Sequence, residues 1–350
     1  MRKVLGLLLL LVAVSGTWAQ ERQDTIVVSR DGTGNFRTLQ EAIESARAFM
    51  DYTVTIYVRN GVYKEKVIVP SWVENIDIIG EDRDKTIITY DDHANINKMG
   101  TFRTYTVKVE GSDITFKNLT IENNAAQLGQ AVALHTEGDR LKFINCRILG
   151  NQDTIYTGAK FTRLYFKDCY IDGTTDFIFG PSTALFEDCI IHSKRNSYVT
   201  AASTPKEAKY GYVFKHCKLT AEPGVDKVYL GRPWRPYAYT LFIECELGKH
   251  IVSAGWHNWG KQSNEETARY MEYKNTGEGA NASERVAWRK RKLSDDIAPE
   301  IHPFLDRRII GRYTNKDKLN FFSVLFGRFL CSADPFWIAS PFSALAGMPY

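Results

Sequence analysis

The apolar and polar positions in the middle of the chain follow a repeated phrase. In each copy an apolar residue stands three positions after a Phe, and an Ile or Leu follows two positions later. Five copies have Cys as the first of these apolar residues, and successive Cys residues are 20 to 28 positions apart. Such a period indicates an internal repeat. The six copies lie at residues 116–121, 143–148, 166–171, 186–191, 214–219 and 242–247.

The spacing within a copy predicts a corner in the chain. Side chains alternate between the two faces of a strand, so residues three positions apart point to opposite faces. All three apolar side chains can face one interior only if the chain bends between them. The residues at the bend are polar, namely Asn118, Asn145, Asp168, Asp188, His216 and Glu244. A strand, a corner, a second strand and a return in each period describe one coil of an all-β fold, the parallel β-helix.

The same repeat argues against other folds and accounts for the cysteines. A leucine-rich horseshoe needs Leu-rich phrases, and a propeller blade needs roughly 40 residues or more. Parallel side chains on stacked coils suit a disulfide torsion poorly, and the sequence has no Cys-x-x-Cys pair for a metal. We therefore predict small buried side chains, stacked along the core, at Cys146, Cys169, Cys189, Cys217 and Cys245. Cys331 lies outside the repeat.

Other elements are predicted on both sides of the repeat. Apolar residues at helical spacing predict an amphipathic helix over residues 36–50, which would cap the open end of the β-helix. Beyond Trp259 the repeat fades, and we expect an irregular C-terminal segment. Short β-branched runs predict the strands of the first coils at residues 54–58, 76–79, 86–89 and 106–109.

The first residues have the pattern of a targeting segment. Arg2 and Lys3 precede an apolar run of 11 residues, and small and polar residues follow up to Ala19. The run is shorter than the roughly 20 residues that span a bilayer, so we predict a cleaved signal and no membrane span. Export to the periplasm or the cell exterior follows. The predicted parts are the signal at residues 1–19, a β-helical catalytic domain at 24–300 and a tail of unknown role at 301–350.

The charge balance narrows the class of partner. The chain has 45 Lys and Arg residues against 41 Asp and Glu residues, a formal charge of +4, which does not indicate binding to nucleic acid. Removal of Arg2 and Lys3 with the signal would leave 4 − 2 = +2. Attraction to an acidic partner must then come from a local group of positive charges and not from the net charge. We expect the protein to be a monomer.

The repeat places two carboxylates in equivalent positions. Asp153 lies seven residues after Cys146, and Asp176 lies seven residues after Cys169. If the coils stack in register, the two side chains should be about 5 Å apart. Two full charges at that distance repel by about 3 kcal/mol at an effective dielectric constant of about 20. One carboxyl should therefore hold a proton while the other is ionised.

Further polar and aromatic residues accompany the two aspartates. Amide donors, a cation and rings able to stack on sugars make a carbohydrate active site. They are Gln130, Gln152, Tyr156, Phe179, Arg232 and Trp234. In the segment Gly-Trp-His-Asn-Trp at residues 255–259, we expect His257 to be structural or at the rim of a cleft. Trp256 is expected to contribute to sugar stacking.

On these residues the chain resembles the pectin methylesterase (pectinesterase) family, as a bacterial-type secreted member. The resemblance covers about residues 27–259 and is specific, because several motifs occur in the same order on a β-helix period. The motifs are Asp-Gly-Thr-Gly-Asn-Phe at 31–36, Gly-Val-Tyr-Lys-Glu at 61–65, Gln-Ala-Val-Ala-Leu at 130–134, Gln-Asp-Thr-Ile-Tyr at 152–156, Asp-Phe-Ile-Phe-Gly at 176–180 and Leu-Gly-Arg-Pro-Trp at 230–234.

The resemblance implies a right-handed β-helix that removes methyl esters from pectin, the methylated homogalacturonan, and releases methanol. It makes Asp176 the nucleophile and Asp153 the general acid and later base. Gln130 and Gln152 would stabilise the oxyanion, and Arg232 would orient Asp176 and keep it charged. The substrate would be held by Gln130, Arg232, Trp234, Tyr156, Phe179 and Thr101. The resemblance implies no metal and no cofactor.

Other functions remain open from the residues alone. A β-helical pectate lyase would use calcium-binding carboxylates and an Arg base, and a polygalacturonase would use paired aspartates to hydrolyse a glycosidic bond. A calcium requirement or new reducing ends would indicate these enzymes, whereas methanol release without chain shortening would indicate the esterase. A non-catalytic polysaccharide-binding β-helix is also conceivable, although binding alone does not require paired carboxylates.

Overall fold

The computed structural model describes residues 25–290, which form three parallel sheets. The predicted signal at 1–19, the tail at 301–350 and Cys331 lie outside the described residues. Sheet 1 contains, in order, β1 (Thr25–Val28), β2 (Val54–Val58), β5 (Ile76–Gly80), β8 (Ile114–Lys117), β11 (Leu141–Ile144), β14 (Arg163–Lys167), β17 (Thr183–Glu187), β20 (Tyr212–Lys215), β23 (Tyr239–Ile243) and β25 (Arg269–Tyr273).

The other two sheets follow the same order along the chain. Sheet 2 contains β3 (Gly61–Lys64), β6 (Thr86–Tyr90), β9 (Thr120–Asn123), β12 (Arg147–Leu149), β15 (Tyr170–Gly173), β18 (Ile190–Ser193), β21 (Lys218–Ala221) and β24 (Glu246–Leu247). Sheet 3 contains β4 (Val67–Val69), β7 (Val107–Val109), β10 (Leu134–Thr136), β13 (Ile155–Thr157), β16 (Ile178–Gly180), β19 (Tyr198–Ala202) and β22 (Tyr229–Gly231).

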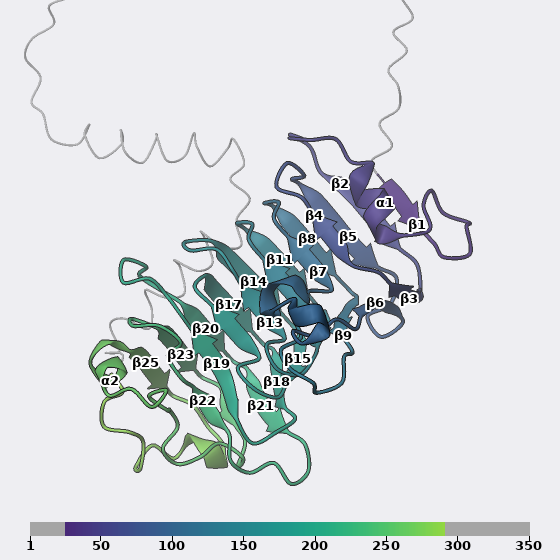
Figure 1. Cartoon of the computed structure of the whole chain (residues 1–350). Coiled ribbons are helices and arrows are strands. Elements are labelled where there is room, and N and C mark those ends of the chain that lie inside the picture. The colour runs from purple at the N-terminus through teal and green to yellow at the C-terminus, as the bar shows by residue number, and fades with distance from the viewer. Residues whose placement is uncertain (1–24, 291–350) are drawn as a thin grey trace, which may run out of the picture. The chain divides into compact units, whose positions relative to one another are not determined.

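From β2 to β22 each coil gives one strand to each sheet, and strands at equivalent places on neighbouring coils pair in parallel (Figure 1). The fold is therefore the predicted right-handed parallel β-helix. The Phe side chains of the repeat lie in register and are fully buried in sheet 1. Their rings stack with centroids 4.4 to 5.3 Å apart and planes 8° to 11° from parallel. This row comprises Phe116, Phe143, Phe166, Phe186, Phe214 and Phe242.

The predicted corners and cysteines are confirmed. The six corner residues between sheets 1 and 2 all have left-handed backbone, with φ between 51° and 55°. One such residue reverses the face on which the following side chains point, so the Cys after each corner returns to the interior. The five cysteines of the repeat are free and buried, and each thiol donates a hydrogen bond of 3.3 to 3.5 Å to the Phe carbonyl of the preceding copy.

The N-terminal cap is a shorter helix than the spacing predicts. Only α1 (Leu39–Glu44) is helical, and it begins with a capping box between Thr38 and Glu41. Its buried residues are Leu39, Ala42 and Ile43. The prediction of 36–50 was wrong at both ends, because Phe36 bridges Val28 beside sheet 1 and residues 45–50 form turns. Met50 is nevertheless buried, which produced the helical spacing without a helix.

The coil pattern also continues past Trp259, contrary to the prediction that it fades there. After α2 (Ser263–Thr267), β25 extends sheet 1, and Lys274 makes a seventh corner with φ 48°. In this coil Glu272 pairs with Phe242, and the side chain of Asn275 bonds to the backbone of Cys245. The repeat is hidden because Glu272 and Asn275 stand where Phe and Cys stood before. Glu272 is neutralised by the buried Arg285, at 3.0 Å.

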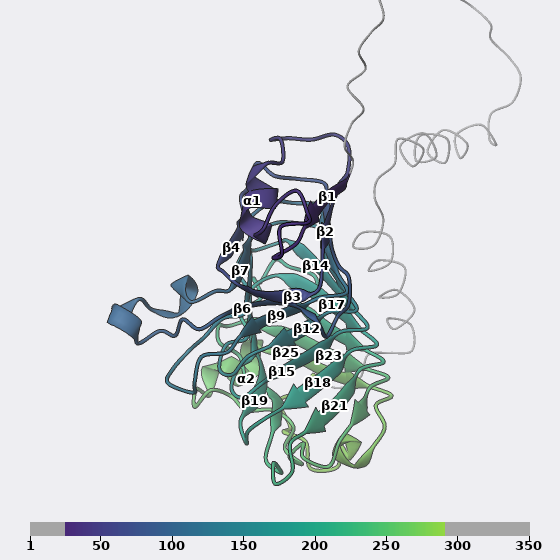
Figure 2. The same cartoon turned by 90° about the vertical axis from the view of Figure 1, so that its right-hand side faces the viewer.

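Within residues 25–290, three 3-10 helices lie outside the coils. η1 (Ile96–Lys98) and η2 (Thr101–Arg103) occupy one long segment between β6 and β7 that stands out from the coils (Figure 2). η3 (Glu278–Ala280) follows the last corner. None of the helices in residues 25–290 is long and apolar enough to cross a membrane.

Removal of one ring from the Phe row should lower the stability of the fold. Phe186 is fully buried between Phe166 and Phe214, so Phe186→Ala should lower the free energy of unfolding by about 3–5 kcal/mol, through lost burial and a residual cavity. Urea unfolding measures the change. The same substitution at Phe161, which is 59% exposed, should change it by less than about 0.5 kcal/mol. Equal effects at both positions would contradict the stacked core.

Candidate active site

The two aspartates occupy equivalent places at the start of neighbouring strands. Tyr156 on β13 pairs with Phe179 on β16, and Asp153 and Asp176 each lie three residues earlier. Both aspartates have left-handed backbone, with φ 66° and 48°, in the turn that leads into sheet 3. The in-register stacking expected from the repeat is therefore present. Both aspartates lie where strands of sheet 3 begin.

A cavity of about 240 Å³ opens beside the two carboxyl groups. Eight residues predicted for the site line it: Thr101, Gln130, Gln152, Asp153, Asp176, Phe179, Arg232 and Trp234. These residues come from the coils of β10, β13, β16 and β22 and from the segment that carries η2. Strand stacking thus gathers side chains that are up to 133 positions apart, from Thr101 to Trp234, into one site.

Two aromatic residues lie elsewhere than expected. Tyr156 does not line the cavity, but its ring stacks on Phe179 at 4.7 Å and packs against Phe102 at 4.8 Å. Tyr156 therefore supports the wall. Trp256 is only 1% exposed, and its ring stacks on Tyr270 at 4.3 Å inside the core. The expectation that Trp256 stacks on sugar is wrong, because the ring faces the interior.

Asp176 is held by a two-point ion pair with Arg232. The guanidinium donates from Nε to Oδ1 at 3.0 Å and from Nη2 to Oδ2 at 2.6 Å. Both partners are largely shielded from water, since their side chains are 20% and 8% exposed. Arg232 lies 56 residues after Asp176, and it reaches the carboxylate across the intervening coil of β19. A planar fork of this kind fixes both the position and the charge of its partner.

Burial and nearby charges act differently on the pKa values of the two carboxyl groups. Burial is the main cause that raises the pKa of Asp153 well above its usual range, the charge of Asp176 raises it further, and Arg232 lowers it. Burial also raises the pKa of Asp176, and the hydrogen bonds and charge of Arg232 oppose that rise. The expectation that Arg232 lowers the pKa of Asp176 describes one contribution, but burial outweighs it. The proton is therefore held preferentially by Asp153.

Gln130 and Gln152 lie on adjacent coils, and Gln152 directly precedes Asp153. The Ala131 N–H donates to the Gln152 carbonyl at 3.0 Å, which stacks the segment of Gln130 on that of Gln152. The Gln130 carbonyl is itself fixed by the Ala94 N–H at 2.8 Å. Both glutamines line the same cavity as Asp153 and Asp176.

Three lining residues were missed from the sequence: Phe102, Ala201 and Trp259. Phe102 follows Thr101 on η2, and no periodicity marks a segment that leaves the coils. Ala201 carries no chemical signal, although it pairs with Phe179 in sheet 3. Trp259 belongs to the segment 255–259, where Trp256 was chosen instead. Nothing in the sequence separates the two tryptophans, because Trp256 is buried by packing against Tyr270.

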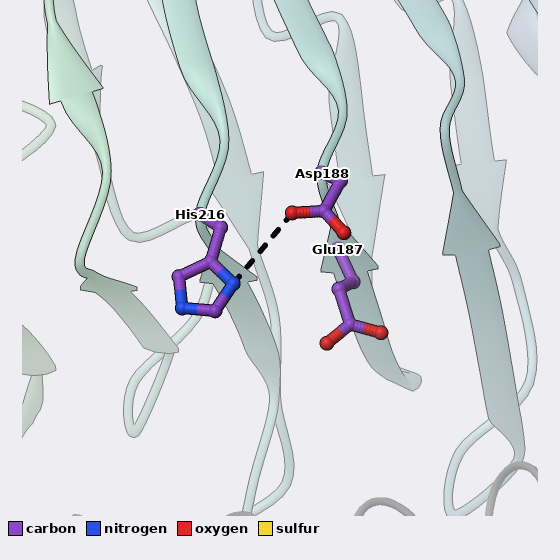
Figure 3. Close-up of side chains that lie close together, drawn as sticks. All are labelled: Glu187, Asp188 and His216. Atoms are coloured by element: carbon purple, nitrogen blue, oxygen red, sulfur yellow. Dashed lines mark ion pairs between the residues drawn. The ribbon is translucent and has the colours of Figure 1, made fainter.

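The structure contains one group of side chains with metal-ligand spacing among residues 25–290, and it lies away from this cavity. The group consists of Glu187, Asp188 and His216, at the corner between sheets 1 and 2 (Figure 3). His216 Nδ1 lies 3.6 Å from an Asp188 oxygen, Glu187 pairs with Lys215 at 2.8 Å, and Asp188 pairs with Lys167. These carboxylates are neutralised by lysines, so we assign them to surface ion pairs.

The fold and site match a known family. A family model described as Pectinesterase matches residues 25–311. The chain belongs to the pectinesterase family. Pectinesterase 31 from Arabidopsis thaliana is 39% identical over 292 residues, which is 80% of this chain and 91% of that protein.

Solved pectin methylesterase structures also resemble this chain. The enzyme from carrot has 34% sequence identity and a TM-score of 0.75, with 78% of this chain and 89% of that chain covered. The enzyme from Erwinia chrysanthemi has 29% identity and a TM-score of 0.71, with 83% and 97% covered. The chain is thus a carboxylic ester hydrolase of the pectinesterase family, which decides against the lyase, the polygalacturonase and the non-catalytic binding protein.

The raised pKa of Asp153 predicts a specific pH dependence of stability. The folded protein keeps the Asp153 proton above the ordinary pKa of 3.8, where the unfolded chain has lost it. Stability should therefore fall as pH rises above about 4, by at most about 1.4 kcal/mol per pH unit. Asp153→Asn removes this contribution, so the unfolding free energy of the variant minus that of the wild type should grow with pH.

Denaturant unfolding at several pH values tests this difference. Asp51→Asn, at an exposed position, is the matched control and should leave the pH dependence unchanged. A difference between Asp153→Asn and wild type that stays constant from acid to neutral pH would show that Asp153 ionises as an ordinary carboxyl group.

Proposed function

We propose that this chain removes methyl esters from pectin with Asp176 as the nucleophile and Asp153 as the general acid and base. The observation that carries the proposal is the two-point pairing of Asp176 with Arg232 beside a second buried carboxyl group with a raised pKa. A carboxylate is a weak nucleophile and must be ionised and held close to its target. A carboxylic acid next to it can protonate a leaving group.

In the first half of the reaction, a carboxylate oxygen of Asp176 attacks the carbonyl carbon of the methyl ester. Negative charge develops on the carbonyl oxygen, and the amide N–H groups of Gln130 and Gln152 stabilise it. The bond to the methoxy group then breaks, and Asp153 transfers its proton to that oxygen. Methanol leaves, and an anhydride joins Asp176 to the galacturonate.

In the second half, Asp153 is ionised and takes a proton from a water molecule. The oxygen of this water attacks the galacturonate acyl carbon, and the anhydride bond breaks. Asp176 recovers its carboxylate and Asp153 its proton, and free galacturonic acid leaves. The net change is one ester and one water converted into one acid and methanol.

The apolar side of the cavity suits a sugar chain. Phe179 and Trp234 have ring centroids 5.8 Å apart, and Thr101 and Phe102, on the segment that stands out from the coils, also line the cavity. A solved pectin methylesterase that resembles this chain, with 29% identity, was crystallised with a hexasaccharide. We assign the same cavity to methylated homogalacturonan, with no nucleic acid as partner and no cofactor.

The proposal includes the cellular context. The segment 1–19 acts as a cleaved signal, the chain is exported to the periplasm or the cell exterior, and it works there as a monomer. The catalytic domain extends over 24–300, followed by the tail. We also propose that the chain is a bacterial-type member of the family. The relatives themselves include plant, fungal and bacterial proteins.

Asp176→Asn should fold normally and lose nearly all methanol release. A neutral amide cannot attack the ester, whereas the similar shape keeps the hydrogen bonds to Arg232 in part. Methanol release from highly methylated pectin measures the activity, and reducing ends measured in parallel should not increase. Turnover near the wild-type rate by the folded variant would refute Asp176 as the nucleophile.

Gln152→Ala should lower kcat by about 100-fold, with a smaller effect on KM, because an oxyanion donor acts mainly in the transition state. Steady-state kinetics on methylated pectin measure both constants. Asn151→Ala is a neighbouring control, since its side chain bonds to the Ala125 carbonyl and does not line the cavity. A change confined to KM would make Gln152 a substrate-binding residue instead.

A further inference from the structure

Both faces of the Arg232 guanidinium are covered by aromatic rings. The Cζ atom lies 3.9 Å from the centroid of the Tyr198 ring and 3.8 Å from the centroid of the Trp259 ring. The edge of the same group, through Nε and Nη2, donates to Asp176. A planar cation can use its faces and its edge at the same time. The rings therefore fix the plane of Arg232, while the carboxylate fixes its edge.

The place of Tyr198 in sheet 3 fixes the position of its ring. Tyr198 opens β19, the strand between β16 and β22, and its carbonyl accepts a hydrogen bond of 2.8 Å from the Asp176 N–H. Its ring stacks on that of Tyr229 at 5.3 Å, on the next coil. Tyr198 does not line the cavity, so it reaches the reaction only through Arg232 and the backbone of Asp176.

The Trp259 ring is held by a tight turn. Trp259 has left-handed backbone, with φ 64°, which is strained for a bulky side chain. Its N–H donates to His257 Nδ1 at 3.0 Å, and the flanking Asn258 bonds to Glu265 at 2.7 Å and accepts from the Gly260 N–H at 2.8 Å. Nδ1 can accept only if it carries no proton. Burial and the charge of Arg232 lower the pKa of His257, which favours the neutral ring that this hydrogen bond requires.

We propose that Tyr198 and Trp259 are positioning residues, which clamp the Arg232 guanidinium so that it holds Asp176 ready to attack. The inference rests on the proposed role of Asp176 as nucleophile. Arg side chains lose much conformational freedom when they are fixed, and two ring faces remove that freedom before substrate binds. The clamp also excludes water from both faces of the cation, which strengthens its attraction to the carboxylate.

Tyr198→Leu gives the cleaner test, because Trp259 also lines the cavity and can touch substrate. Loss of the ring should lower kcat about tenfold and change KM less than about threefold. Tyr198→Phe keeps the ring and should restore at least half of the wild-type kcat. Trp259→Leu should lower kcat similarly, and Trp259→Phe should recover most of it. Trp72→Leu, at a 52% exposed position far along the chain, controls for loss of a surface ring.

A double-mutant cycle separates the clamp from a general loss of structure. In an Arg232→Ala background, Tyr198→Leu should lower kcat by less than about twofold, because the ring acts only through Arg232. An undiminished tenfold loss in that background would overturn the clamp, as would a Tyr198→Leu enzyme whose KM alone changes. If Asp176→Asn or Arg232→Ala were as active as the wild type, the proposed function would fail before the clamp was tested.

Discussion

The in-register stacking of parallel coils is the constraint on which the rest of this structure depends. It places the Phe rings in one buried row and requires a left-handed residue at each corner, so that the Cys after it returns to the interior. The same register puts Asp153 and Asp176 at matching positions on neighbouring coils. The active site is therefore not a separate addition to the scaffold. It uses the spacing of the scaffold to bring two carboxyl groups together.

The chemistry follows from how two like charges are accommodated in a poorly solvated place. Burial alone would drive both carboxyl groups toward the protonated form, and neither would then be a nucleophile. Arg232 makes the two carboxyl groups different, because its guanidinium donates to Asp176 at two points and gives no hydrogen bond to Asp153. Asp153 keeps the proton that the leaving methanol needs. One cation thus divides the roles of nucleophile and acid, and the rings of Tyr198 and Trp259 keep that cation in place.

Much of this could be predicted from the sequence, because register converts spacing into position. The repeat of Phe and Cys was enough for the coils, the corners and the paired aspartates. It failed where the pattern is carried by different residue types, as in the last coil, where Glu272 and Asn275 replace Phe and Cys. It also failed for Phe102, since a segment that leaves the coils has no period, and for Trp256, whose burial depends on packing against Tyr270. The packing of the Tyr198 ring against Arg232 is visible only in the three-dimensional contacts.

Infrared difference spectroscopy of the carboxyl groups can show whether Asp153 holds the proton while Asp176 is ionised. Spectra of wild type minus Asp153→Asn and of wild type minus Asp176→Asn would be recorded near the pH of highest activity. If Asp153 holds the proton, Asp153→Asn removes a protonated carboxyl band and Asp176→Asn removes only carboxylate bands. Loss of the protonated band in Asp176→Asn, or of carboxylate bands in both variants, would contradict it.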